Sequence, residues 1–408
     1  MKFLELNNTL VAFENIEDTP RCAVYLYLAT DKQPVFNGVH VLLGNLLLQG
    51  TDKKTSEEIA TELENLGIEV SIDSRTDYLK ISIVCLNEDI EKALDIVDDF
   101  MNNANFASFD KEVFKFKGET ASSLDSPVTK ASDAFYRELF KNHKYGITNT
   151  KILETIDNMT IDHVKEQYKN LSEGKKIISI AATVENEDEF LDMVTKKLTF
   201  MRNSNKAAFN KDFLDYGKGS LIKIVKNDAK QAQIFQGWLV EGALSKDCAK
   251  LSVLNTILGA SGLSSRLFTE LRDKRGLAYT VRSSYKTLQH AAYFMLYIGT
   301  EPSNIKKSLE GFKSEIQRII DEPPSKEELI GAIENNIGKF KYFFTQTNAQ
   351  IASSNGSNWI NDLGFDYNDK LMEEIKNVTS DDVVDAAKKY LLKEPVTVVL
   401  APENYLNF

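Results

Sequence analysis

A repeated segment constrains the fold of this chain more than any other feature of its sequence. Residues 156–164 read IDNMTIDHV and residues 375–383 read IKNVTSDDV, so both fit the pattern I-x-N-[MV]-T-x-D-x-V at an offset of 219 residues. In each copy a threonine, Thr160 or Thr379, is expected to cap a helix. A strand is expected after that helix, at 177–184 or 396–402. The chain is therefore predicted to contain the same structural unit twice.

A second correspondence between the halves extends this duplication. The strand-like run ISIVCL (81–86) and the strand-like run YFMLYIGT (293–300) are each followed by apolar residues at helical spacing. A partner strand precedes each run, at 68–73 and 277–285, and the polar turn SRTD (74–77) suits an antiparallel hairpin. Antiparallel strands with helices gathered on one face predict an α+β fold rather than a doubly wound sheet.

The predicted organisation is two tandem homologous domains. A length of 408 residues exceeds one ordinary domain. The segment 202–219 is rich in Asn, Lys and Gly and lacks periodicity, so we interpret it as a linker. The domains are accordingly expected at 1–201 and 220–408, each a mainly antiparallel sheet packed against helices.

Composition and charge exclude several classes of protein. A net charge of -11 argues against a general nucleic-acid binder, which needs a basic surface. No run of about 18 apolar residues predicts a membrane span, and the N-terminus lacks the apolar core of a signal peptide. The cysteines, Cys22, Cys85 and Cys248, are scattered and have no metal-ligand spacing, which indicates buried thiols and a cytoplasmic location.

The stretch NGVHVLLGNLLLQGT (37–51) has the features of an incomplete metal-binding helix. In His-x-x-Glu-His, a helix presents two imidazoles to one zinc ion and places the glutamate beside the bound water as general base. Here His40 stands at the first ligand position, but Leu43 stands at the base position and Gly44 at the second ligand position. The alternative for His40 is an ordinary, partly buried helix histidine with a hydrogen-bond partner.

The chain resembles the M16 family of inverted zincins, which includes pitrilysin, insulin-degrading enzyme, the mitochondrial processing peptidase and the cytochrome bc1 core proteins. The resemblance covers nearly the whole chain and includes LLLQGT (46–51), at the end of the metal helix, and KEVFKFKGETASSLDSP (111–127). In that second segment Glu112 and Glu119 stand seven residues apart, before Asp125 and Pro127. The resemblance implies two domains of the LuxS and processing-peptidase type, with Glu119 at the third-ligand position.

Of the four catalytic positions, only His40 and Glu119 keep suitable residues, and two such ligands would hold zinc poorly. Leu43 cannot accept a proton from water. His143 and His163 are the other histidines of this half and are weak candidates for a rebuilt metal site. We therefore expect the chain to bind no cofactor and to lack catalytic residues of its own.

The segment SRLFTELRDKRGLAYTVRSSY (265–285) carries the second candidate site. It is predicted to form a helix that stops at Gly276, followed by a strand with Leu277, Tyr279, Val281 and Tyr285 on one face. A reversal at Gly276 would bring Arg272 and Tyr279 together, and both side chains can donate to peptide carbonyl oxygens. Taken alone, Arg272 also fits a solvated charge cluster at a helix C-terminus. The resemblance implies the substrate-binding function, because an arginine and a tyrosine seven residues apart form the R/Y pair of the family.

These observations indicate a non-catalytic subunit of a heterodimeric zinc peptidase, in which a partner chain with an intact His-x-x-Glu-His supplies the zinc and this chain supplies the R/Y pair. Such half-length pairs occur among bacterial relatives of the resembled family. The expected ligand is an unfolded peptide that adds to a strand edge. Two alternatives remain open, namely a non-enzymatic scaffold like the core proteins and a peptidase with an atypical metal site. A homodimer of the isolated chain is also compatible with the sequence.

Overall fold

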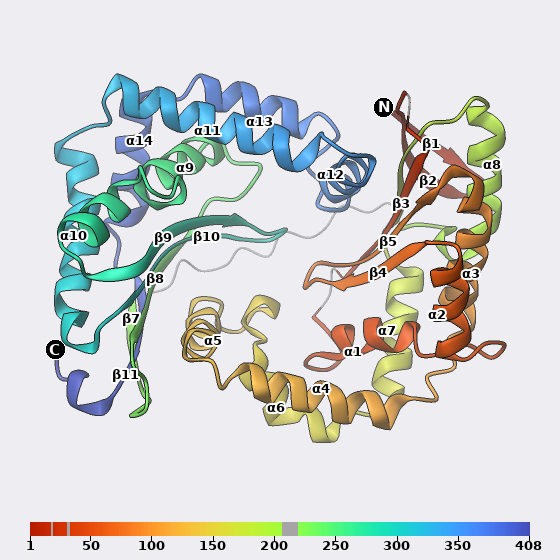
Figure 1. The fold of residues 1–408 in the computed structure, drawn as a ribbon, viewed down its shortest axis with the longest axis horizontal. Coiled ribbons are helices and arrows are strands. Elements are labelled where there is room, and N and C mark those ends of the chain that lie inside the picture. Colours follow the sequence, from red (N-terminus) through yellow and green to blue (C-terminus); the bar gives the residue numbers. More distant parts are fainter. Residues whose placement is uncertain (18, 31–32, 206–218) are drawn as a thin grey trace. The chain divides into compact units, whose positions relative to one another are not determined.

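The computed structural model describes residues 1–17, 19–30, 33–205 and 219–408, which form two compact units (Figure 1). The first unit comprises the described residues of Met1–Thr120, Lys151–Asn210 and Lys341–Phe365. The second comprises those of Ala121–Thr150, Lys211–Phe340 and Asp366–Phe408. Each unit is built around one mixed, mainly antiparallel β-sheet. The structure therefore confirms the predicted α+β fold.

The first sheet has the strand order β1-β2-β6-β3-β5-β4. Every neighbouring pair is antiparallel except β2 with β6. The elements of this unit, with α4 and α6 reaching its boundaries, are β1 (Lys2–Leu6), β2 (Thr9–Asn15), β3 (Arg21–Ala29), α1 (Val39–Leu47), α2 (Ser56–Asn65), β4 (Glu69–Ser74), β5 (Tyr78–Leu86), η1 (Asn87–Asp89), α3 (Ile90–Asn103), α4 (Phe109–Ser123), α6 (Asn149–Thr155), η3 (Ile156–Asn158), α7 (Ile161–Glu173), β6 (Lys176–Ala182), α8 (Glu187–Lys197), η4 (Thr199–Met201) and α12 (Asn348–Ile360).

Helix α12 covers one face of the first sheet, against β3 and β6, although it comes from the C-terminal half of the chain. Successive strand side chains alternate between faces, so Tyr25 and Tyr27 of β3 pack with Ala352 and Ile360 of α12. Gly356 allows the close approach, because a Cβ there would lie 2.3 Å from the Tyr27 ring. Small residues in α12 therefore let a helix seat directly on the aromatic face of the sheet.

The second sheet has the strand order β7-β11-β8-β10-β9, with β11 and β7 as its parallel pair. The elements of this unit, with α11 reaching its boundary, are α5 (Pro127–Leu139), η2 (Lys144–Gly146), β7 (Ser220–Val225), β8 (Ala232–Val240), α9 (Cys248–Asn255), η5 (Thr256–Ala260), η6 (Phe268–Lys274), β9 (Ala278–Thr287), β10 (Ala292–Thr300), η7 (Pro302–Asn304), α10 (Ile305–Asp321), α11 (Lys326–Phe344), α13 (Tyr367–Lys376), α14 (Ser380–Ala386), η8 (Ala387–Leu391), β11 (Val396–Ala401) and η9 (Glu403–Tyr405).

The second unit repeats the arrangement with a helix from the N-terminal half. Helix α5 packs on β8 and β11. Phe135 of α5 lies against Gly237 of β8, where an added Cβ would approach its ring to 2.5 Å. The opposite face of the sheet packs against a separate core that includes Leu254 of α9 and Phe312 of α10. Both sheets are thus buried on two faces.

The structure confirms the predicted hairpin of β4 and β5 and the cap at Thr379, whose hydroxyl accepts the Asp382 N–H at 3.2 Å. The compact units differ from the continuous halves 1–201 and 220–408, because α5 and α12 belong by packing to the unit of the other half. Most of the predicted linker, 206–218, lies outside the described residues. Among the helices that are described, none is both long and apolar enough to span a membrane.

Candidate functional site

Helix α1 carries the three helical positions of the incomplete metal motif. It follows Gly38, whose φ of 80° allows the chain to turn into the helix. His40 is half-buried, whereas Leu43 is fully buried at 0% exposure. The position that would need a catalytic carboxylate beside water is therefore part of the hydrophobic core.

Gly44 lies against the edge strand β4. A Cβ built on Gly44 would lie 2.3 Å from Ser74 Oγ and 3.3 Å from Ile72 Cγ2. A β-carbon cannot approach an oxygen this closely, so Ser74 would have to move even for alanine. A larger side chain at this position would require Ser74 and Ile72 of β4 to move.

Helix α4 carries the two glutamates of the third-ligand segment and passes the start of α1. Phe116 marks this proximity, because its ring would lie 3.2 Å from a Cβ built on Gly38. Glu119 is exposed, whereas Glu112 is 2% exposed and its Oε2 has no hydrogen-bond partner among the described residues. In the part of the chain that the structure describes, no three His, Cys, Asp or Glu side chains are grouped to hold a metal ion. With Leu43 in the core and Gly44 against Ser74, the residues do not fit the zinc site of an inverted zincin.

The other two histidines considered as substitutes have different contacts. His163 accepts the Thr160 N–H on Nδ1 at 3.1 Å and stacks on Phe36, with ring centroids 4.6 Å apart. His143 is buried in the second unit and accepts the Tyr145 N–H on Nδ1 at 3.3 Å. His163 therefore caps the start of a helix in the first unit, whereas His143 belongs to a short turn in the second unit.

Arg272 and Tyr279 lie in direct contact in the second unit, although they come from a helix and a strand. The Arg272 guanidinium carbon is 4.7 Å from the Tyr279 ring centroid and 4.5 Å from that of Phe268. Arg272 Nη1 also donates to the Tyr279 carbonyl oxygen at 2.8 Å. These contacts hold the guanidinium plane between two aromatic rings, an arrangement that stabilises a cation.

The turn between them depends on Gly276, whose φ of 60° lies in the left-handed region. The preceding helix η6 is a π-helix, in which Arg275 N–H reaches back to the Glu270 carbonyl. The Leu277 N–H then closes the turn on the Leu271 carbonyl at 2.8 Å. The helix end and the strand start are thereby fixed to each other.

A β-bulge at the start of β9 decides where Tyr279 points. Ala278 pairs with Thr300 but Thr280 pairs with Gly299, so Tyr279 is the extra residue. The prediction that Tyr279 lies on the same face of the strand as Leu277 and Val281 is therefore wrong, because the extra residue interrupts the alternation of side chains. Those two residues are 6% exposed, whereas Tyr279 is 77% exposed. The bulge presents the tyrosine ring to solvent beside Arg272.

The charges around Arg272 leave it without an acidic partner. Glu270 accepts two bonds from Arg275, at 3.0 and 3.1 Å, and pairs with Lys274 at 3.1 Å. The bonds from Lys274 and Arg275 hold the pKa of the Glu270 carboxyl below its ordinary value. Among the described residues Arg272 forms no ion pair, so its positive charge remains available to an incoming acceptor.

Arg266 is a positioning residue that the sequence did not single out. Its side chain is 10% exposed and makes a bidentate pair with Glu328, with N–O distances of 2.8 and 2.7 Å. Its Nη1 also donates to the carbonyls of Arg318 and Glu322. The segment that leads into η6 is thus attached to α10 and α11. In the sequence, Arg266 is visible only as the arginine of SRLF (265–268), and nothing in that motif distinguishes a buried, paired arginine from a solvated one.

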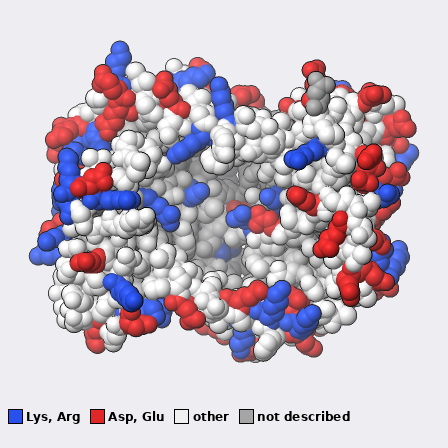
Figure 2. All heavy atoms as spheres, viewed as in Figure 1, with Lys and Arg blue, Asp and Glu red and all other residues white. Residues whose placement is uncertain are grey.

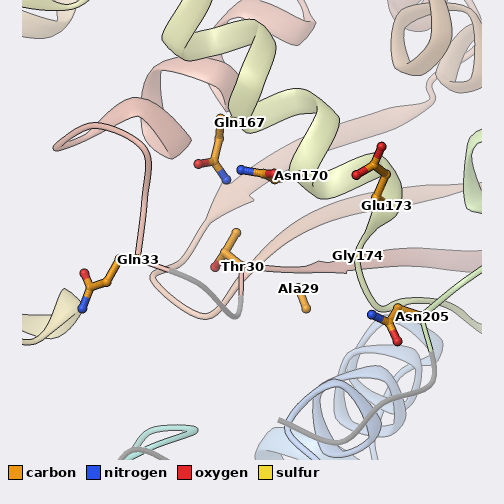
Figure 3. Close-up of a pocket in the computed structure, with 8 residues that line it drawn as sticks. All are labelled: Ala29, Thr30, Gln33, Gln167, Asn170, Glu173, Gly174 and Asn205. Carbon is orange, nitrogen blue, oxygen red and sulfur yellow. The ribbon is translucent and has the colours of Figure 1, made fainter. Parts of the chain in front are cut away.

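A small cavity of about 60 Å³ lies elsewhere, in the first unit between β3 and α7. Figure 3 shows Gln167 and Asn170 of α7 on the same side of the cavity, above Thr30. The other polar residues of the lining are Gln33, Glu173 and Asn205. None of the predicted site residues lines this cavity. The candidate site therefore remains the Arg272/Tyr279 pair.

Comparison with solved structures agrees with this fold. A peptidase M16 inactive domain from Pseudomonas fluorescens matches with a TM-score of 0.86 and 20% identity over 98% of both chains. A protease from Helicobacter pylori matches with a TM-score of 0.87 and 19% identity, covering 98% of this chain and 99% of the other. The fold of this chain is therefore that of these two solved structures.

Sequence comparison gives the family. A model described as insulinase (peptidase family M16) matches residues 10–160, and a model described as peptidase M16 inactive domain matches residues 158–336. The chain belongs to the M16 peptidase family. An uncharacterized zinc protease of Streptomyces coelicolor is 24% identical, with 91% of this chain and 82% of the relative covered.

Two further relatives carry the name YmxG. The uncharacterized zinc protease YmxG of Bacillus subtilis is 22% identical over 97% of both chains. The protein named non-peptidase homolog YmxG of Helicobacter pylori is 24% identical, with 86% of this chain and 82% of the relative covered. The family thus includes similar chains with both peptidase and non-peptidase names.

Proposed function

We propose that this chain is the non-catalytic subunit of a heterodimeric M16 zinc peptidase and supplies Arg272 and Tyr279 to the substrate. The observation that carries the proposal is the contrast between the two candidate sites. The metal helix has Leu43 in the core and Gly44 against Ser74, whereas the half-buried Arg272 is in contact with the exposed Tyr279.

The geometry of the pair suits recognition of a peptide carbonyl. Nη1 of Arg272 is committed to the Tyr279 carbonyl, but the other guanidinium N–H groups have no hydrogen-bond partner among the described residues. The Tyr279 hydroxyl belongs to a side chain that is 77% exposed. A guanidinium and a phenol held 4.7 Å apart, carbon to ring centroid, can donate to one carbonyl oxygen or to the oxyanion formed from it.

The partner chain would contribute the zinc ion, which activates water and polarises the scissile carbonyl. The role of this chain is then to orient the peptide and to stabilise negative charge on the carbonyl oxygen. The names of similar proteins, which include a non-peptidase homolog in Helicobacter pylori, are in keeping with a subunit that lacks its own chemistry.

The test is reconstitution with an M16 chain that has an intact His-x-x-Glu-His. The isolated chain should leave a fluorogenic peptide uncleaved, and the mixture should cleave it. Arg272→Gln and Tyr279→Phe should each lower kcat by about 10²-fold, as does removal of an oxyanion donor elsewhere. Size-exclusion chromatography should show that both variants still assemble with the partner.

Arg275→Gln is the matched control, because Arg275 lies near the end of the same helical segment and its charge is already paired with Glu270. It should retain turnover within a factor of about 3, since exposed ion pairs contribute little. Normal turnover by both the Arg272 and the Tyr279 variants in an assembled complex would refute the proposal.

A non-enzymatic scaffold is the second candidate function. A scaffold has no use for an arginine that lacks an acidic partner among the described residues and lies beside an exposed tyrosine at a strand edge, which is why we rank the scaffold function lower. The same reconstitution separates the two functions, because a scaffold would leave the turnover of every M16 chain tested unchanged.

A further inference from the structure

The sheet edge beside Arg272 and Tyr279 has an unusual charge. Strand β9 is an edge strand and, among the described strands, pairs with β10 alone. Residues 274–300, which contain this whole hairpin, hold four Lys or Arg residues and no Asp or Glu, in a chain of net charge -11. On the face shown in Figure 2, Lys and Arg side chains gather over the β9 and α10 part of the second unit, whereas Asp and Glu are frequent over α2, α3 and α8.

The duplicated hairpin of the first unit shows that this charge is not a requirement of the fold. Its β4 and β5 strands and their turn carry Glu69, Asp73 and Asp77 as well as Arg75 and Lys80. Asp73 there pairs with both Arg75 and Lys80. The β9–β10 hairpin has the same topology without internal neutralisation.

Two of the basic residues occupy one side of β9. Arg282 and Lys286 are exposed and four residues apart, so they lie on the same face of the strand, about 14 Å from each other. Ser284 stands between them on that face. The Arg282 guanidinium lies 5.1 Å from the Tyr297 ring of β10, which holds its stem along the sheet. Among the described residues neither Arg282 nor Lys286 forms an ion pair.

A peptide that extends the sheet at the free edge of β9 places alternate side chains on that same face. Directly opposed side chains on neighbouring strands have Cβ atoms about 4.5–5.5 Å apart, which is the range of cross-strand charge pairs. Acidic residues four positions apart in the peptide would then stand opposite Arg282 and Lys286. Basic residues there would meet like charges.

We infer that the β9 edge selects extended peptides with acidic side chains at alternate positions, Arg282 and Lys286 being the specificity-determining residues. This rests on the proposed function, in which peptide lies beside Arg272 and Tyr279. It adds the substrate class to that function. The selection is electrostatic and acts along the strand, whereas the Arg272/Tyr279 pair acts on a carbonyl group whatever the side chains are.

The test uses three fluorescein-labelled eight-residue peptides that alternate valine or threonine with glutamate, glutamine or lysine. Binding to the isolated chain is measured by fluorescence anisotropy. The glutamate peptide should bind about 10-fold more tightly than the glutamine peptide in low salt, at about 3-fold for each of two charge pairs. The lysine peptide should bind most weakly. The preference should shrink in 0.5 M salt (about a 4 Å screening length).

Arg282→Gln with Lys286→Gln should remove the preference for glutamate over glutamine. Arg282→Glu with Lys286→Glu should make the lysine peptide the tightest ligand. The matched control is Lys306→Gln with Lys313→Gln, which makes the same charge change at exposed positions of α10 and should retain the preference.

Equal binding of the three peptides, no measurable binding of any, or a preference that survives Arg282→Gln with Lys286→Gln would overturn the inference. Binding of a labelled oligothymidylate as tightly as the glutamate peptide would also overturn it, because the edge would then be a general anion site. These results leave the proposed function standing, since turnover of a peptide without charged side chains by the assembled complex does not involve Arg282 or Lys286.

Discussion

Rebuilding the zinc motif on α1, with Leu43→Glu and Gly44→His, should strongly destabilise the first unit rather than create a peptidase. Leu43 is 0% exposed, and its loss removes about 1.5–3 kcal/mol of apolar burial. A buried polar group without partners costs about 1–3 kcal/mol more. Overpacking at Gly44, where Ser74 Oγ lies 2.3 Å from a built Cβ, adds about 1–3 kcal/mol.

The expected loss is therefore about 3.5–9 kcal/mol, against a typical domain stability of about 5–15 kcal/mol. Urea unfolding followed by circular dichroism gives the free energy of unfolding, and elemental analysis gives the zinc content.

The loss of stability should also depend on pH. The introduced carboxyl is neutral when buried, so its folded pKa lies above the unfolded value of about 4.3. Stability should consequently fall as pH rises above that value, by up to about 1.4 kcal/mol per pH unit.

Two controls separate the steric part from the polar part. Leu43→Met conserves volume and should cost less than about 1.5 kcal/mol. Ser74→Gly should relieve Gly44→Ala, so the two changes together should be more stable than the sum of the single effects by about 1–2 kcal/mol. A doubly substituted Leu43→Glu, Gly44→His protein with the wild-type unfolding midpoint and one zinc per chain would refute the packing argument.

Two further predictions concern charged side chains inside the units. Arg266→Lys keeps the charge but loses the bidentate pair with Glu328 and both carbonyl contacts, so it should lower the free energy of unfolding by about 1–3 kcal/mol; an unchanged urea midpoint would contradict this. Lys176 is 2% exposed, and burial lowers the pKa of its ammonium group to about 8. In the unfolded chain the Lys176 ammonium keeps its ordinary pKa of 10.5, so between pH 8 and 10.5 the unfolded state binds more protons than the folded state. The free energy of unfolding of the wild type should therefore rise by about 1.5 kcal/mol from pH 8 to 9.5 relative to Lys176→Met. Parallel pH profiles of stability for the two proteins would refute this prediction.

The candidate site was predictable from sequence as far as local pattern reaches. Seven residues, with a glycine between helix and strand, were enough to place Arg272 and Tyr279 together. The stacking of Arg272 on Phe268 and the exposure of Tyr279 were not, because they depend on the π-helical turn and on the bulge opposite Gly299. A one-residue irregularity in strand pairing leaves no trace in the alternation of apolar residues.

The helix exchange between the units was equally beyond sequence. Helix α5 has an ordinary amphipathic pattern, which indicates that it packs but not on which sheet. Helix α5 packs on the second sheet because Gly237 leaves room for the Phe135 ring. These two residues are about a hundred positions apart and come into contact only in the folded chain. For α12 the matching pair is Gly356 and Tyr27.

By itself the sequence determined the duplication and the α+β class, because these follow from repeated motifs and from the periodicity of apolar residues. Its motifs also carry the resemblance to the family, and the loss of two of four metal-site positions is read from that resemblance. The tertiary structure alone decided that Gly44 lies against Ser74 and that Leu43 is buried in the core. It also decided that the charge of Arg272 has no acidic partner among the described residues, since Glu270 pairs with Lys274 and Arg275 instead. Packing and charge pairing involve residues that are distant in sequence, and their outcome is fixed only when the chain has folded.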